Sequence, residues 1–290
     1  MTRAEDRGMT AMPEIRCSHP ADHLHVTRLV TVDLEAMHGY ADYPQVPAPP
    51  SPFQIEVWDW RAAPPIMEAK PEDGYYCPAA DTVSETIVTQ GIWEPVETIA
   101  MISMFRQAKS TPGEVWQFVD VGAQLGWYSV LASIHRLHVH AIEADPDVAA
   151  VLERNLMENS HVIDAGYDVY VGRVPGADLG DFLRIPAIAK IDIEGAEGSA
   201  LELMEHDLLD TGLLKGLLIE LSPVFGVDTD AIVDVLMRHY RFAAHFLPPK
   251  MVPPVPYRGI AGWGDGWTDA DAVAKAVREH EQVNLVFTRR

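Results

Sequence analysis

The segment from Phe118 to Tyr128 constrains the fold of this chain more than any other stretch. It reads Phe-Val-Asp-Val-Gly-Ala-Gln-Leu-Gly-Trp-Tyr: an apolar run with an acidic residue near its end, a turn with two glycines, and the start of a helix-forming segment. This order predicts a strand, a tight turn and a helix N-terminus, which is where α/β sheets bind nucleotide-like ligands. We expect Gly122 and Gly126 to let the backbone approach such a ligand, because neither carries a Cβ.

A second acidic residue supports this interpretation. The run from His138 to Glu143 is typical of a strand, and Glu143 ends it. Glu143 follows the first glycine by about 20 residues, the spacing at which Rossmann-type folds place a carboxylate on ribose hydroxyls. Asp145 and Pro146 then predict a capped helix start.

Strands and helices alternate through the middle of the chain. We expect strands at about 116–121, 138–143, 167–171, 188–193 and 216–221, and helices at about 95–109, 127–135, 146–158, 197–209 and 228–240. Such alternation predicts an α/β fold with a parallel sheet. A further strand is expected from Gln282 to Phe287.

The turn chemistry favours S-adenosylmethionine over NAD as the ligand. A dinucleotide site uses G-x-G-x-x-G to hold a pyrophosphate, whereas this chain has Gly122 and Gly126 without the middle glycine. Asp120 would repel a pyrophosphate but attract a sulfonium or an ammonium group. S-Adenosylmethionine carries both cations and no phosphate.

Three motifs resemble the FkbM family of methyltransferases. Residues 120–127 match the family pattern D-V-G-A-N-x-G-W with Gln124 in place of asparagine, residues 143–146 match its acidic strand end, and residues 190–197 read K-I-D-I-E-G-A-E. Residues 91–95 are similar to its lead-in to a helix. The resemblance implies a class I methyltransferase Rossmann-like sheet, mostly parallel with a terminal antiparallel strand, and methyl transfer to oxygen. The cofactor contacts that follow are Asp120, Gly122, Gln124, Gly126, Trp127, Tyr128, Glu143 and Asp192.

The candidate catalytic residues are Lys190, Asp192 and Glu194, at the end of the fourth strand. A carboxylate here could accept a hydroxyl proton, could only orient the acceptor, or could hold Mg²⁺ together with Glu220. Lys190 is a poor base because the carboxylates beside it favour its charged form, so we expect a Lys190–Asp192 pair that organises the site. Glu197 is interpreted equally well as a partner of the helix dipole and as a functional group.

Composition limits the partners. The formal net charge of −21, with no basic cluster, argues against nucleic acid as a substrate. No apolar segment approaches the length of a membrane span, the first residues lack a signal peptide, and the two cysteines suggest no disulfide framework. We therefore expect a cytoplasmic protein that acts on a small-molecule or glycan acceptor.

We divide the chain into an N-terminal, β-leaning extension or cap over residues 1–80 and a catalytic domain over 81–290. Residues 248–281, rich in proline, glycine and tryptophan, are expected to form a substrate lid or a loop packed on the sheet edge. Among the histidines, His138 and His140 are expected to share a face of one strand as core or edge residues, and His245 is a weak candidate base.

The leading hypothesis is a methyltransferase that acts on a hydroxyl of a sugar or natural-product-like acceptor. The alternatives are a catalytically silent module that binds S-adenosylmethionine or a nucleotide, and an NAD-dependent oxidoreductase.

Overall fold

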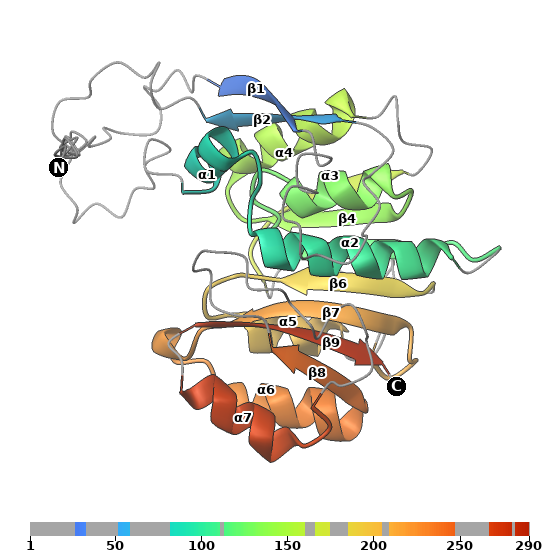
Figure 1. Ribbon diagram of the computed structural model, residues 1–290, viewed down its shortest axis with the longest axis vertical. Coiled ribbons are helices and arrows are strands. Elements are labelled where there is room, and N and C mark those ends of the chain that lie inside the picture. The colour runs from blue at the N-terminus through green and yellow to red at the C-terminus, as the bar shows by residue number, and fades with distance from the viewer. Residues whose placement is uncertain are drawn as a thin grey trace, which may run out of the picture.

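A seven-stranded sheet organises the protein, as the computed structural model in Figure 1 shows. The structure describes residues 27–32, 52–58, 82–110, 113–159, 166–174, 185–204, 209–246, 267–279 and 282–289. The strand order is β5-β4-β3-β6-β7-β9-β8. In chain order these strands are β3 (Gln117–Val121), β4 (His138–Glu143), β5 (Tyr167–Val171), β6 (Ala187–Ile191), β7 (Leu214–Leu221), β8 (Phe242–Phe246) and β9 (Val283–Arg289).

The first five of these strands run parallel, and β9 is antiparallel to both β7 and β8. The prediction of a mostly parallel sheet with a terminal antiparallel strand is therefore confirmed. All five residues of both β3 and β6 are buried, because helices cover the two faces of a doubly wound sheet.

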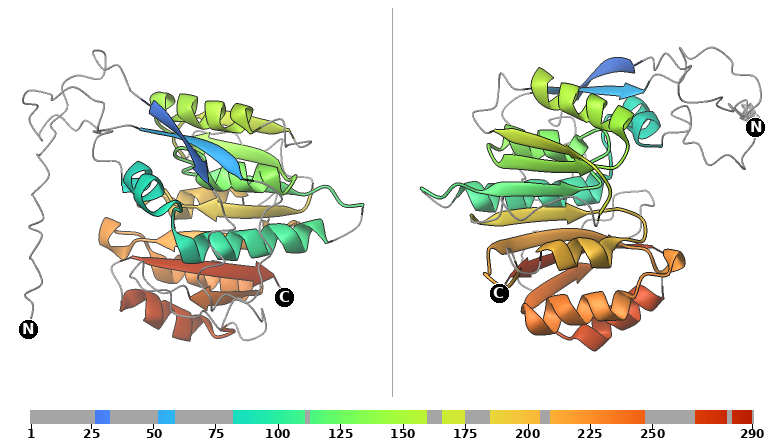
Figure 2. Two further views of the ribbon diagram at one scale, coloured as in Figure 1. Left: turned by 45° about the horizontal axis from the view of Figure 1, so that its top comes forward. Right: turned by 180° about the vertical axis from the view of Figure 1, so that it is seen from behind.

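Two helical layers enclose the sheet (Figures 1 and 2). One core contains residues of α1 (Thr82–Gln90), α2 (Pro95–Lys109), α3 (Trp127–Ile134) and α4 (Pro146–Glu158). The other contains residues of α5 (Glu197–Met204), α6 (Thr229–Asp234), the π-helix Val235–His239 and α7 (Ala270–Arg278). A short 3₁₀-helix, Pro223–Phe225, follows β7.

The alternation of side chains divides each strand between these cores. Phe118, Ile188 and Leu218 belong to the core on the α2 and α3 side, whereas Val119 and Ala189 belong to the opposite core. Asp120 and Lys190 follow Phe118 and Ile188 by two residues, so both point toward α2 and α3.

Two helices begin with an aspartate whose side chain accepts hydrogen bonds from the first backbone N–H groups of the helix. Asp145 caps α4 by accepting hydrogen bonds from the backbone N–H groups of Asp147 and Val148, and Pro146 begins the helix. Asp269 caps α7 in the same way through the N–H of Asp271.

Strand β8 and helix α7 were not expected from the sequence. Helix α7 falls within the segment 248–281 predicted as a lid and packs against α6, while residues 248–266, 280 and 281 of that segment lie outside the described residues. None of the helices in the described stretches has the length and apolar character that crossing a membrane requires.

A separate two-stranded antiparallel sheet, β1 (Thr27–Val32) and β2 (Phe53–Trp58), lies beside α4 at the top of Figure 1. Asn155 on α4 and Asn159, directly after the helix, hydrogen-bond the β2 backbone through their side-chain amides. Arg154 pairs with Glu56 at 2.8 Å. These polar contacts, together with apolar packing of β2 in the α4 core, hold the ribbon on the helical layer rather than on the edge of the large sheet.

Candidate functional site

The candidate site lies at the carboxyl ends of β3 and β6. From β3 the chain continues outward to β4 and β5, whereas from β6 it continues in the opposite direction to β7. Ligands of open α/β sheets bind at such a switch point. The strand exits are tied together here: Gly122 and Ala123 donate their N–H groups to the carbonyl of Ile142, and Asp192 donates to Val121, all at 3.0 Å.

The two glycines of the turn are required by neighbouring chain segments. Gly122 and Gly126 have positive φ angles of 82° and 89°. A Cβ on Gly122 would lie 2.0 Å from the carbonyl oxygen of Asp192, and one on Gly126 would lie 2.4 Å from Cδ1 of Leu152. We expected these positions to make room for a ligand; in the structure, Gly122 sets how closely the β3 turn approaches Asp192.

Glu143 shapes the same turn from the end of β4. Its Oε2 accepts a hydrogen bond from the backbone N–H of Gln124 (2.8 Å), and its Oε1 accepts one from the N–H of Asp145 (3.0 Å). Gln124 has a φ of 51°, and its side-chain Oε1 accepts from the N–H of Leu125 at 3.2 Å. Glu143 and Gln124 thus both lie at the turn where the cofactor is predicted to bind, and their hydrogen bonds stabilise the conformation of that turn.

Asp120 is a buried carboxylate with 1% of its surface exposed. Its Oδ2 accepts a hydrogen bond from the hydroxyl of Ser129 at 2.6 Å. Its Oδ1 is buried and has no hydrogen-bond partner within the described part of the chain. Burial raises the pKa of Asp120 to about 6, although the charge of Lys190 acts to lower it. A buried acceptor of this kind offers a place for a cationic or N–H group, since such atoms are rarely left unsatisfied.

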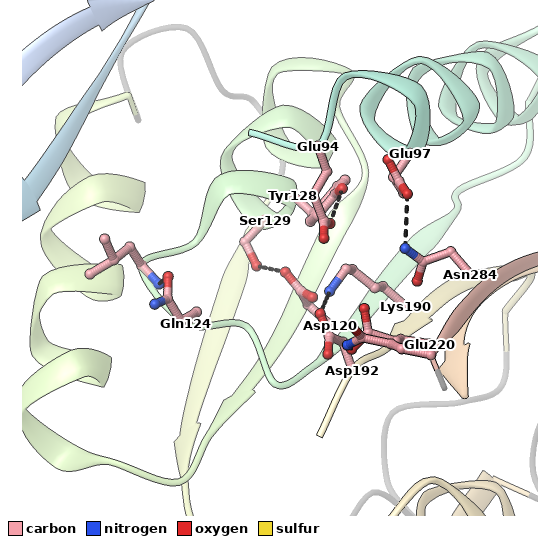
Figure 3. A network of polar contacts seen from close by, with 12 residues as sticks. Glu94, Glu97, Asp120, Gln124, Tyr128, Ser129, Lys190, Asp192, Glu220 and Asn284 are labelled. Atoms are coloured by element: carbon pink, nitrogen blue, oxygen red, sulfur yellow. Dashed lines mark hydrogen bonds and ion pairs between the residues drawn. The ribbon is translucent and has the colours of Figure 1, made fainter. Parts of the chain in front are cut away.

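Lys190 lies at the centre of the polar network in Figure 3. Its Nζ donates to Oδ2 of Asp192 at 2.7 Å and lies 5.0 Å from the centroid of the Tyr128 ring. Burial acts to lower the pKa of Lys190, but the charges of Asp192, Glu94 and Asp120 outweigh it and raise the pKa above its usual range. Lys190 therefore stays protonated. The predicted Lys190–Asp192 pair is present, and a lysine held in its charged form is poorly suited to act as a base.

Glu94 belongs to the network although the sequence did not single it out as a site residue. It directly precedes α2 with a left-handed φ of 41°, and it is 5% exposed. The hydroxyl of Tyr128 donates to its Oε2 at 2.8 Å. Burial, followed by the charges of Glu94 and Glu97, raises the pKa of Tyr128 well above its ordinary value, so Tyr128 remains a hydrogen-bond donor.

The network continues toward β7 and β9. Glu220, near the end of β7 and 4% exposed, accepts a hydrogen bond from the side-chain amide of Gln282. Glu97 on α2 accepts one from Nδ2 of Asn284 at 2.8 Å, and Asn284 is the register partner of Glu220. Polar side chains from α2, α3, β3, β6, β7 and β9 therefore meet on one face of the sheet (Figure 3).

Glu194 lies outside this cluster, contrary to our expectation. Strand β6 ends at Ile191, so Glu194 occupies an exposed turn with a φ of 47°. The strand expected to reach residue 193 thus ends two residues earlier, and Asp192 lies half-buried at its exit. The carboxylates that do meet are Glu94, Asp192 and Glu220, whose ligand atoms lie within 4.8 Å of one another.

This acidic trio replaces the predicted Mg²⁺ set of Asp192, Glu194 and Glu220. Its oxygens suit a hard cation. However, the ammonium of Lys190 already lies on Asp192 at 2.7 Å, and it supplies positive charge at the position where a metal ion would have to compete.

Glu197 begins α5 and is fully buried. Both of its carboxylate oxygens accept the backbone N–H of Gly195, at 3.0 and 3.1 Å. Burial raises the pKa of Glu197. Of the two interpretations of this residue, these contacts favour the structural one at the helix start.

Trp127, a predicted cofactor contact, and His245, a candidate base, both contact neighbouring side chains. Trp127 is 3% exposed; its Nε1 donates to Oγ1 of Thr98 at 2.8 Å, and its ring lies edge-on to Phe53 at 5.5 Å. Its predicted cofactor contact stays a prediction. His245 lies on β8, one of the two edge strands, where its Nε2 is 3.3 Å from Oγ1 of Thr288.

No family model and no curated protein matches this chain in sequence. The family resemblance noted above therefore stays an expectation.

Several solved structures are similar in arrangement. One is a TehB-like SAM-dependent methyltransferase from Corynebacterium glutamicum, with 14% identity over 71% of this chain and 94% of that one, and a TM-score of 0.39. Another is precorrin-6y C5,15-methyltransferase from Geobacter metallireducens, with 10% identity over 65% and 87%, and a TM-score of 0.39. A third is a tRNA (uracil-54, C5)-methyltransferase from Pyrococcus abyssi in complex with S-adenosyl-L-homocysteine, with 11% identity over 67% and 38%, and a TM-score of 0.38. Because these similarities are so low, the functional argument below is built on the residues of this chain.

Proposed function

We propose that this protein is an S-adenosylmethionine-dependent methyltransferase that transfers a methyl group to a hydroxyl of a sugar or natural-product-like small molecule. The observation that carries the proposal is the surplus of buried negative charge at the switch point of the sheet. Among the described residues, the carboxylates of Glu94, Asp120, Asp192 and Glu220 gather around the single ammonium of Lys190.

Such a site suits a cationic ligand. Buried carboxylates are costly unless they are paired, so a cation that enters this cluster gains attraction in a medium of low dielectric constant. The buried Oδ1 of Asp120, which lacks a donor in the described structure, supports the same conclusion. A pyrophosphate would meet net repulsion here, because several carboxylates face one ammonium, and this argues against an NAD-dependent oxidoreductase.

The residues of the turn fit the remainder of the ligand. Glu143 has one backbone N–H on each carboxylate oxygen, and a carboxylate offers about four acceptor positions, so it retains capacity for ribose hydroxyls. Asp120, Gly122, Gln124, Gly126 and Glu143 would hold S-adenosylmethionine, with Asp192 beside them. When bound, the cofactor would supply an electrophilic methyl carbon.

Asp192 is the residue we assign to the acceptor. It is half-buried at the strand exit, and its Oδ2 is held by Lys190. Because Lys190 stays charged, Asp192 would either accept the hydroxyl proton or orient the oxygen for in-line attack. An acceptor without phosphate groups is favoured because the chain carries a net charge of −21.

The proposal is tested by calorimetric titration of the purified protein with S-adenosylmethionine, S-adenosylhomocysteine and NAD⁺. Binding of the first two in the micromolar range without NAD⁺ is the expected result. Glu143→Ala should weaken that binding by about 1–3 kcal/mol, while Glu202→Ala, which removes an exposed carboxylate on α5, should leave it unchanged. Binding of NAD⁺ alone would overturn the proposal.

A second measurement distinguishes an enzyme from a silent binding module. Release of S-adenosylhomocysteine would be followed with a panel of sugar and polyketide acceptors. Asp192→Asn should lower turnover by about 10²–10⁴-fold if Asp192 accepts the proton, and by much less if it only orients the acceptor. Cofactor binding with no turnover on any acceptor would favour the silent module.

A further inference from the structure

A second polar cluster lies on the other face of the sheet. His138 and His140 lie on β4, and Asp168 lies on the edge strand β5, where it is the register partner of His140. Val139 and Ala141 belong to the core on the α3 and α4 side. The two histidines alternate with them and therefore point to the opposite face, away from Lys190.

The imidazoles of His138 and His140 both approach the same carboxylate oxygen of Asp168. Nε2 of His138 lies 2.9 Å from Oδ2 of Asp168, and Nδ1 of His140 lies 3.4 Å from the same atom. One ligand atom of each residue lies within 4.8 Å of the others. With zinc–ligand bonds of about 2.0–2.1 Å, tetrahedral ligands are separated by about 3.3 Å, so these atoms already have nearly the spacing of a metal site.

The backbone at Gly166 leaves room for the His138 ring in the ligating orientation. A Cβ on Gly166 would lie 2.8 Å from Cε1 and 2.9 Å from Nδ1 of the His138 ring. The Nδ1 edge of the ring is therefore seated against Gly166, while Nε2 is turned toward Asp168. Only a glycine leaves the ring this position.

The two histidines differ in exposure in a way that suits a metal ligand set. The side chain of His140 is 6% exposed, whereas those of His138 and Asp168 are 34% and 47% exposed, so an ion can enter from solvent.

We propose that His138, His140 and Asp168 form a binding site for one divalent transition-metal ion of the zinc class. Two imidazoles and one carboxylate favour Zn²⁺ over Mg²⁺ or Ca²⁺, which prefer oxygen ligands. The fourth position faces solvent. The bound ion links the edge strand β5 to β4 independently of the cofactor site.

The simpler explanation is an imidazole–carboxylate hydrogen bond without a metal, and binding measurements separate the two. The full chain, stripped with chelator, would be titrated with ZnCl₂ and with MgCl₂ by calorimetry. We expect His138→Ala and Asp168→Asn each to remove one equivalent of bound Zn²⁺, and the exposed control His239→Ala to remove none. Because this control varies only the position of the lost histidine, zinc held elsewhere on the chain does not affect the comparison.

Gly166→Ala provides a test that leaves all three ligands in place. The added methyl group would displace the His138 ring, and we expect affinity for Zn²⁺ at this site to fall at least about tenfold with the circular dichroism spectrum unchanged. Co²⁺ would serve as a spectroscopic probe, since its visible bands should disappear in Asp168→Asn. Equal zinc stoichiometry and affinity in the parent, His138→Ala and Asp168→Asn would overturn the proposal, whatever the outcome of the cofactor titration.

Discussion

The two polar clusters of this sheet differ in how much water reaches them. The cluster around Lys190 lies under α2 and α3, where Asp120, Glu94, Lys190 and Glu220 are each no more than 5% exposed. The cluster of His138, His140 and Asp168 lies toward an edge strand, with two of its three side chains open to solvent.

This difference decides what each cluster can do. In the buried cluster, burial and neighbouring charges together shift the pKa values of Asp120, Tyr128 and Lys190. A ligand there acts through charge, and changes there should strongly affect folding. In the solvent-facing cluster, an exposed ion pair contributes little to stability, so exchanging it for a metal ligand should cost the fold little.

The largest expected contrast is in the free energy of unfolding, between a glycine-to-alanine substitution at Gly122 and the same substitution at Gly166. Gly122→Ala places a Cβ 2.0 Å from a backbone oxygen at a φ of 82°, so neither group can yield. We expect a loss of about 4 kcal/mol in the free energy of unfolding. Gly166→Ala meets only the end of the partly exposed His138 ring and should cost less than about 1 kcal/mol. Urea unfolding measures both; equal losses would contradict the contrast.

Removing the central ammonium should have the next largest effect. Lys190→Met leaves the carboxylates of Asp192 and Asp120 without their countercharge, and we expect a loss of about 3 kcal/mol at pH 8. At pH 5 the loss should be smaller, because Asp120 with its pKa of about 6 takes up a proton. Lys215→Met, the same change at an exposed position of β7, should stay within about 0.5 kcal/mol in urea unfolding. A comparable loss in both variants would show that charge burial is not the cause.

Local patterns in the sequence predicted the strands and helices around the turn. The β3, β4 and α4 segments were expected within about a residue of their observed bounds, since apolar runs, a glycine turn and an Asp-Pro cap mark them. Helix α7 was missed because it follows a segment dense in proline, glycine and tryptophan, although its capping residue Asp269 was visible.

The site was only partly predictable for a different reason. Asp120, Lys190 and Asp192 lie in neighbouring strands and were identified from their motifs. Glu94, by contrast, reaches the cluster only because α2 packs over β6 and β7. A carboxylate directly before a helix-starting proline is not a sequence pattern that indicates function. The contact between Glu94 and Tyr128 joins residues far apart in the sequence, so only the tertiary structure reveals it.

A smaller effect, of opposite sign, is expected from Asp120→Asn. Because the pKa of Asp120 is raised in the folded state, the native protein holds the proton more tightly, and stability falls as pH rises from about 4 to about 6. Asn removes this penalty, so the variant should be more stable than the parent by about 1–3 kcal/mol at pH 8 and by about half as much at pH 5. The same change should weaken binding of S-adenosylmethionine. Chemical denaturation and calorimetry at both pH values test this, with Asp168→Asn in the solvent-facing cluster as the control; lower stability of Asp120→Asn at pH 8 would contradict it.

The smallest effect is expected from His138→Ala in the presence of EDTA. The ring contributes a half-exposed contact with Asp168, so its removal should cost less than about 1 kcal/mol. In excess Zn²⁺, the parent protein should gain thermal stability that the variant lacks, because a ligand that binds only the folded state raises the melting temperature. Thermal unfolding with EDTA and with Zn²⁺ separates the two contributions. A loss above about 2 kcal/mol in EDTA would show that His138 supports the fold itself, and the two clusters would then differ less in kind than their exposures indicate.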